Sequence, residues 1–127
     1  MTSSTSLFIE FALEKKVLQF GDFLTKAGRN SPYFFNLGAF NDGESLKRLG
    51  EFYANKILDT KIEFDMIFGP AYKGIPLVSA SSIALSNKSK NVPYSFNRKE
   101  AKDHGEGGEI IGSSIKGNVL VIDDVIS

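Results

Sequence analysis

The chain has 127 residues with 15 basic and 15 acidic side chains, and this balance gives no support for binding to nucleic acid or to a membrane surface. It has no cysteine, which excludes disulfides, thiolate zinc sites and cysteine nucleophiles and is typical of a reducing compartment. No apolar run approaches the roughly 18 residues of a membrane-spanning helix, and the N-terminus lacks the basic start of a secretory signal. We therefore expect a soluble cytoplasmic protein, with one domain as the default for this length.

The first 40 residues predict one short helix followed by short strands. Leu7, Phe8, Phe11 and Ala12 follow the spacing of an amphipathic helix, with Thr5 or Ser6 as its N-cap. The stretch 17–38 mixes aromatic residues with Gly, Asn and Pro, which is typical of strands joined by turns.

From about residue 43 onward, predicted helices alternate with predicted strands. The expected elements are a helix after Asp42 with an apolar stripe (Leu46, Leu49, Tyr53, Ile57), a buried strand at 64–68, a helix from Gly74 to about Ser86, and strands at 94–97 and 119–122. This alternation predicts an α/β domain with a mainly parallel sheet flanked by helices. Ligands usually bind at the carboxyl ends of such strands, where the segments 69–74, 96–99 and 123–127 would lie.

Two acidic residues, Asp123 and Asp124, directly follow the segment 119–122, which has the strongest signal for a buried strand in the chain. Adjacent carboxylates can bind the vicinal hydroxyls of a sugar or a hydrated magnesium ion, because hard oxygen ligands suit that ion. The alternative is a solvated turn that caps the next helix. The dipeptide by itself leaves both interpretations open.

The segment from Gly69 to Gly74 joins a predicted strand to a predicted helix. Backbone N–H groups at the start of a helix attract anions, and Lys73 adds a full positive charge. The alternative is an ordinary turn with a surface lysine. Neither a GxxxxGK[ST] phosphate loop nor a GxGxxG motif occurs in the chain.

The segment 97–109 has only one apolar side chain, the methyl group of Ala101, among its charged residues and glycines. The glycines loosen the backbone, and the cations at 98, 99 and 102 would suit a lid that closes over a polyanion and excludes water. A solvated charged loop is the alternative.

The segment 26–36 has two basic residues beside three consecutive aromatic residues. This combination would suit a site that holds a flat anionic ring by stacking and charge. The alternative is that the aromatic residues belong to the core.

Four segments resemble one known family. VLVIDDVIS (119–127) resembles the start of the phosphoribosyl-diphosphate signature of type I phosphoribosyltransferases. KAGRNSPYFFN (26–36), FGPAYKGIP (68–76) and FNRKEAKDHGEGG (96–108) are similar to the bacterial-type orotate phosphoribosyltransferases, and the similarity runs from about Phe8 to Ile126. The resemblance implies transfer of phosphoribosyl from phosphoribosyl diphosphate to orotate, giving orotidine 5′-phosphate and pyrophosphate in pyrimidine biosynthesis. It also implies Mg²⁺ held mainly by the substrate, with no direct protein ligand, and a homodimer whose lids are shared between subunits.

The resemblance also implies roles for particular residues. The catalytic residues would be Lys102 and His104 of the lid and the acids Asp123 and Asp124. Orotate would contact Phe34, Phe35 and Lys26. Phosphoribosyl diphosphate would contact Lys26, Tyr72, Lys73, Arg98, Lys99, Lys102, His104, Asp123, Asp124, Val125, Ile126 and Ser127, and the loop with Tyr72 often holds a non-proline cis peptide in relatives.

The implied fold is a single type I phosphoribosyltransferase domain that stops inside its signature at Ser127. Residues 1–40 would form a helix and an orotate-side hood, and residues 41–127 the first part of the α/β core with a lid at 98–109. We expect the chain to be a fragment without activity of its own, because the family's 5′-phosphate loop would follow Ser127. A regulatory domain that binds nucleotide or nucleic acid, a fragment that only dimerises and a purine-type transferase are the alternatives. The lid cations disfavour the first and the Phe34-Phe35 pair disfavours the last.

Overall fold

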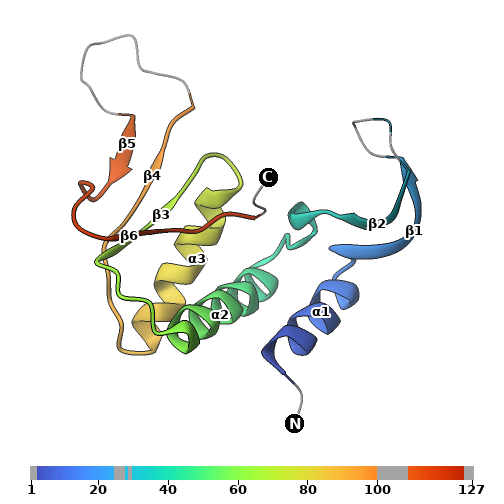
Figure 1. Ribbon diagram of the computed structural model, residues 1–127, viewed down its shortest axis with the longest axis horizontal. Helices are drawn as coiled ribbons and strands as arrows, with labels where there is room; N and C mark the ends of the chain where they lie inside the picture. Colours follow the sequence, from blue (N-terminus) through green and yellow to red (C-terminus); the bar gives the residue numbers. More distant parts are fainter. Residues whose placement is uncertain (1–2, 25–27, 29, 100–108, 125–127) are drawn as a thin grey trace. The chain divides into compact units, whose positions relative to one another are not determined.

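The computed structural model describes residues 3–24, 28, 30–99 and 109–124 (Figure 1). The chain forms two compact units, Met1–Ser45 and Leu46–Ser127. None of the helices in the described residues is long and apolar enough to span a membrane.

The first unit contains a helix and a two-stranded hairpin. Helix α1 (Ser4–Glu14) is followed by the antiparallel strands β1 (Leu18–Leu24) and β2 (Asn30–Phe35) and by the short 3-10 helix η1 (Leu37–Ala39). The rings of Phe11 and Phe40 stack with centroids 4.9 Å apart, and both side chains are buried. The predicted helix and strands are therefore confirmed in this unit.

The predicted N-cap of α1 was wrong. Ser3 is the N-cap, because its side-chain oxygen accepts a hydrogen bond from the backbone N–H of Ser6 at 3.1 Å. Every residue from Thr2 to Ser6 is Ser or Thr, so each offers a hydroxyl of the kind that N-caps use. The N-cap therefore lies two or three residues earlier than the apolar spacing suggested.

The second unit is an α/β structure. Helix α2 (Gly43–Thr60) leads into it, and it continues through β3 (Met66–Gly69), α3 (Gly74–Asn87), β4 (Tyr94–Asn97), β5 (Ile110–Gly112) and β6 (Val119–Val121). The strand order is β5-β4-β3-β6, with β3 parallel to both β4 and β6 and with β5 antiparallel to β4. The predicted mainly parallel sheet is thus confirmed, with one antiparallel strand that the sequence did not indicate.

The core of this unit lies between the sheet and α3. Met66 and Ile67 of β3 are buried, as are Leu77, Val78 and Leu85 of α3. Figure 1 shows α2 and α3 side by side, and a Cβ added to Gly50 of α2 would lie 2.5 Å from the backbone oxygen of Ala80. The two helices therefore meet at a residue that has no room for a side chain.

The burial predicted for strand 119–122 was only partly right. Ile122 is buried, but Val119 and Leu120 are half-buried and Val121 is 58% exposed. The reason is the position of β6, which pairs with β3 on one side and stands at an edge of the described sheet.

Candidate functional site

Three parallel strands of the second unit end at the same edge of the sheet. Gly69 of β3 pairs with Phe96 of β4, and Phe68 of β3 pairs with Val121 of β6. The residues that follow these strands therefore gather at one place, as the sequence predicted. They are the loop from Pro70 to Lys73, the segment from Asn97 to Lys99, and the segment from Ile122 to Asp124.

The loop after β3 is closed by tight backbone contacts. The Gly74 N–H donates to the Pro70 oxygen at 2.9 Å, and the Ile75 N–H donates to the Tyr72 oxygen at 3.2 Å. The peptide bond between Ala71 and Tyr72 is cis, as the family resemblance implied. A Cβ on Gly74 would lie 2.8 Å from the Pro70 ring, so the first residue of α3 must be small.

The two side chains of this loop that the sequence analysis singled out are open to solvent. Tyr72 is 61% exposed, and Lys73, directly before α3, is 76% exposed. Their exposure lets the phenol hydroxyl and the ammonium group reach an anion from solvent, beside the positive end of the α3 dipole.

The end of β4 lies against this loop. Asn97 Oδ1 accepts a hydrogen bond from the backbone N–H of Ala71 at 2.7 Å, and Lys99 Nζ lies 5.4 Å from the centroid of the Tyr72 ring. Arg98 is half-buried, and its backbone N–H donates to the oxygen of Glu109 at 2.8 Å. The structure therefore brings Tyr72, Lys73, Arg98 and Lys99 to one edge, whereas sequence reasoning missed Asn97 because an asparagine at a strand end has no distinctive pattern.

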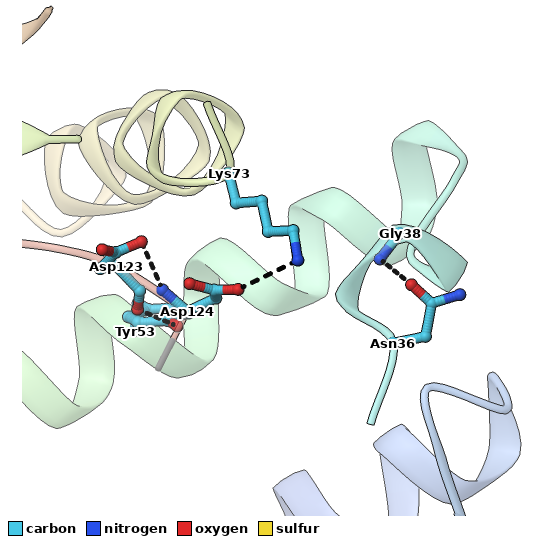
Figure 2. A network of polar contacts seen from close by, with 6 residues as sticks. All are labelled: Asn36, Gly38, Tyr53, Lys73, Asp123 and Asp124. Carbon is cyan, nitrogen blue, oxygen red and sulfur yellow. Dashed lines mark hydrogen bonds and ion pairs between the residues drawn. The ribbon is translucent and has the colours of Figure 1, made fainter. Parts of the chain in front are cut away.

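The acid pair after β6 is held by backbone contacts on one side. The N–H of Asp124 donates to Oδ1 of Asp123 at 2.9 Å, and the hydroxyl of Tyr53 donates to the backbone oxygen of Asp123 at 3.0 Å (Figure 2). Burial, and secondarily the charges of Asp124 and Asp123, raise the pKa of Tyr53 to about 12. Tyr53 therefore stays protonated and donating, a role that its place in the predicted apolar stripe did not reveal.

Opposite charges meet where the loop approaches the acid pair. Lys73 Nζ lies 3.8 Å from Asp124 Oδ2, and the Asp124 side chain is only 14% exposed (Figure 2). A cation beside a carboxylate that is mostly buried forms a site with positive and negative ends. Such a site suits a ligand that has both a polyanionic group and hydroxyl groups.

The predicted orotate contacts belong to the first unit. Phe34 and Phe35 are part of β2, where Phe34 pairs with Gln19 and Phe35 pairs with Leu18. The next residue, Asn36, caps η1 through a 3.1 Å hydrogen bond from the Gly38 N–H to its Oδ1 (Figure 2). The backbone after the aromatic pair is thus fixed locally.

The remaining predicted site residues lie outside the described residues. They are Lys26, Lys102, His104, Val125, Ile126 and Ser127. The helix that Asp123 and Asp124 would cap in the alternative interpretation also falls there. Within the described ranges, no group of at least three His, Asp or Glu residues is placed to hold a metal ion.

Comparisons with known proteins agree with the geometry. The family model of the phosphoribosyl transferase domain matches residues 36–127. The chain is 62% identical over its whole length to the orotate phosphoribosyltransferase of Thiobacillus denitrificans, and it covers 60% of that protein. It is 65% identical over 94% of its length to the orotate phosphoribosyltransferase of Nitrosospira multiformis, and it covers 53% of that protein. The crystal structure of orotate phosphoribosyltransferase from Francisella tularensis matches 94% of the chain with a TM-score of 0.83 and 48% identity, and the match covers 57% of that structure.

Proposed function

Because this chain belongs to the phosphoribosyl transferase domain family, we propose that the full-length protein transfers phosphoribosyl to orotate. The products are orotidine 5′-phosphate and pyrophosphate, in pyrimidine biosynthesis. Support comes from relatives of that name at 62% and 65% identity. The chain spans about half to three fifths of the length of these relatives, so the activity is proposed for the whole protein.

The observation that carries this proposal is the opposition of charge at one sheet edge. Lys73 approaches Asp124 to 3.8 Å, with Arg98 and Lys99 on the neighbouring strand end. In the proposed complex the cations and the Tyr72 hydroxyl bind the diphosphate. The carboxylates of Asp123 and Asp124 accept hydrogen bonds from the ribose hydroxyls.

This arrangement matches the charges that develop during the reaction. The bond from the anomeric carbon to the diphosphate oxygen breaks, and its electron pair leaves with pyrophosphate. A ring nitrogen of orotate forms the new bond, and its proton leaves with the departing pyrophosphate. Positive charge therefore grows on the ribose beside the carboxylates, and negative charge grows on the diphosphate beside the cations, which lowers the barrier on both sides.

The acid pair also fits a role near magnesium. Carboxylates are hard oxygen donors of the kind that Mg²⁺ prefers, and a pair of them suits a hydrated ion held mainly by the diphosphate. When bound, the ion would neutralise part of the diphosphate charge. Asp123 and Asp124 would orient the ribose and hold the water shell of the ion in place.

The segment 98–109 is proposed to act as a lid. It starts at the end of β4 and returns at the start of β5, where the N–H of Arg98 donates to the oxygen of Glu109. Lys102 and His104 would reach the leaving diphosphate and exclude water from the oxocarbenium-like centre. We further propose a cytoplasmic homodimer in which each lid serves the neighbouring subunit, and in which Lys26, Phe34 and Phe35 contact orotate while residues 125–127 contact the substrate's phosphoribosyl group.

The direct test is an ultraviolet assay of orotate consumption by the full-length protein with phosphoribosyl diphosphate and Mg²⁺. Orotate should be consumed, adenine should not be, and a chelator should stop the reaction. Absence of turnover, or preference for adenine, would contradict the proposal.

The shared lid has its own test. Lys102→Ala should mainly lower kcat, with little change in KM. Mixing Lys102→Ala subunits with Asp124→Asn subunits should restore part of the activity. A mixture that stays inactive after subunit exchange would contradict sharing.

A further inference from the structure

The side chain of Asn97 connects two segments that are far apart in the sequence. Asn97 is the last residue of β4, and its Oδ1 accepts a 2.7 Å hydrogen bond from the backbone N–H of Ala71, a residue 26 positions earlier. Its Nδ2 lies 3.5 Å from the carbonyl oxygen of Arg98. Both Asn97 and Ala71 are half-buried, so water competes only partly for this bond.

The position of this bond matters because of what surrounds it. Ala71 directly precedes Tyr72 and Lys73, and Asn97 directly precedes Arg98 and Lys99. One hydrogen bond therefore joins the backbones that present both groups of proposed diphosphate contacts.

Packing does little to fix the tip of this loop. Tyr72 and Lys73 are both mostly exposed, and the backbone bonds of the loop from Gly74 and Ile75 are internal to it. Among the described residues, its side-chain links to the end of β4 are the Asn97 bond and the contact of Lys99 with the Tyr72 ring. An exposed cation–π contact is weak, because water screens the cation.

The chemistry of this position favours a neutral amide. Alanine offers no acceptor and would leave the half-buried N–H of Ala71 unpaired. Aspartate offers an acceptor of the same reach but brings a negative charge next to the cations of the diphosphate site.

We propose that Asn97 is a positioning residue that holds the Ala71–Lys73 backbone against the end of β4, so that both segments form one preorganised diphosphate site. This inference rests on the proposed function for the identity of the anion. The hydrogen bond itself can be tested without any ligand.

The first test measures by NMR how fast the Ala71 amide hydrogen exchanges in the full-length protein without ligand. Asn97→Ala should speed exchange at this amide by about tenfold, since a hydrogen bond worth roughly 1–1.5 kcal/mol is lost. Asn97→Asp should retain the protection because it retains the acceptor. Asn91→Ala, an exposed asparagine before β4, is the matched control and should change nothing. Unchanged protection in Asn97→Ala would overturn the proposal.

The second test is calorimetric binding of phosphoribosyl diphosphate with Mg²⁺ to the same variants. Asn97→Ala should weaken binding by about five- to tenfold through lost preorganisation, while its melting temperature falls only a few degrees below that of the Asn91→Ala control. Asn97→Asp should also weaken binding, by charge, although its Ala71 amide stays protected. Lost protection with unchanged affinity in Asn97→Ala would overturn the role of this bond in the diphosphate site.

The two claims can fail separately. If the wild-type protein does not bind phosphoribosyl diphosphate, the proposed function is refuted, and the exchange result still decides whether Asn97 holds the loop. If Asn97→Ala does not fold, Asn97→Asp decides the question, and full affinity or lost Ala71 protection in that variant would overturn the proposal.

Discussion

Replacing Lys73 with alanine should separate anion binding from stability. The Lys73 side chain is 76% exposed, so solvent screens its ammonium group, and its 3.8 Å approach to Asp124 Oδ2 stabilises the fold by at most about 1 kcal/mol. A charge-assisted hydrogen bond to a bound diphosphate contributes roughly 1.5–3 kcal/mol. That energy corresponds to roughly 10- to 150-fold in affinity. We therefore expect Lys73→Ala to lower affinity for phosphoribosyl diphosphate by this factor while the free energy of unfolding changes by less than about 1 kcal/mol.

Two measurements on the full-length protein check this expectation. Urea denaturation gives the free energy of unfolding, and titration calorimetry with phosphoribosyl diphosphate and Mg²⁺ gives the dissociation constant. Lys88→Ala is the matched control, because Lys88 is an exposed lysine at the opposite end of α3. A loss of stability above about 2 kcal/mol would show a structural role. An affinity within about twofold of the wild type and of the control would refute the diphosphate contact.

Three other predictions concern the stability of the fold. Gly69→Ala should destabilise the protein by about 1–3 kcal/mol, because the new Cβ would press against the backbone oxygen of Gly74, whereas Gly43→Ala meets nothing within 4 Å; equal melting temperatures for the two variants would contradict this. Because burial raises the pKa of Tyr53 from 10.0 to about 12, the stability that its neutral form provides is complete below pH 10 and is lost as the pH rises to about 12. The difference in absorbance at about 295 nm between wild type and Tyr53→Phe reports ionisation of Tyr53 and should have its midpoint near pH 12. A midpoint near the usual pKa of tyrosine would contradict the effect of burial. Asp42 caps the start of α2, because its carboxylate accepts a hydrogen bond from the backbone N–H of Ser45, and this bond lowers the pKa of Asp42. The stability that the cap provides is therefore complete above the usual carboxyl range and is lost as the pH falls. Asp42→Asn should lose stability less steeply in acid than the wild type, and identical acid profiles would argue against the cap.

The sequence predicted the features that depend on local pattern. The alternation of apolar strands and amphipathic helices after residue 43 indicated β3, α3, β4 and β6, and their parallel pairing followed from that alternation. Because parallel strands end at one edge, the convergence of Lys73, Arg98 and Asp124 was predictable without coordinates. Residue roles came mainly from the family resemblance.

Features that depend on distant neighbours could not be predicted. The hydrogen bond of Tyr53 reaches a residue 70 positions away, and that of Asn97 reaches one 26 positions away. Strand β5 is only 3 residues long and follows a polar segment, so its sequence is too short to show the alternation of apolar and polar residues that indicates a strand. The exposure of Val121 reflects the place of β6 in the strand order, which its own apolar sequence does not encode.

Phosphorus NMR of the full-length protein with phosphoribosyl diphosphate, Mg²⁺ and orotate would test the central claim most directly, because it follows the bond that breaks. The diphosphate signals of the substrate should be replaced by those of free pyrophosphate and a nucleotide monophosphate, and only when orotate is present. Persistence of the substrate signals with orotate, or pyrophosphate release that does not depend on orotate, would contradict it.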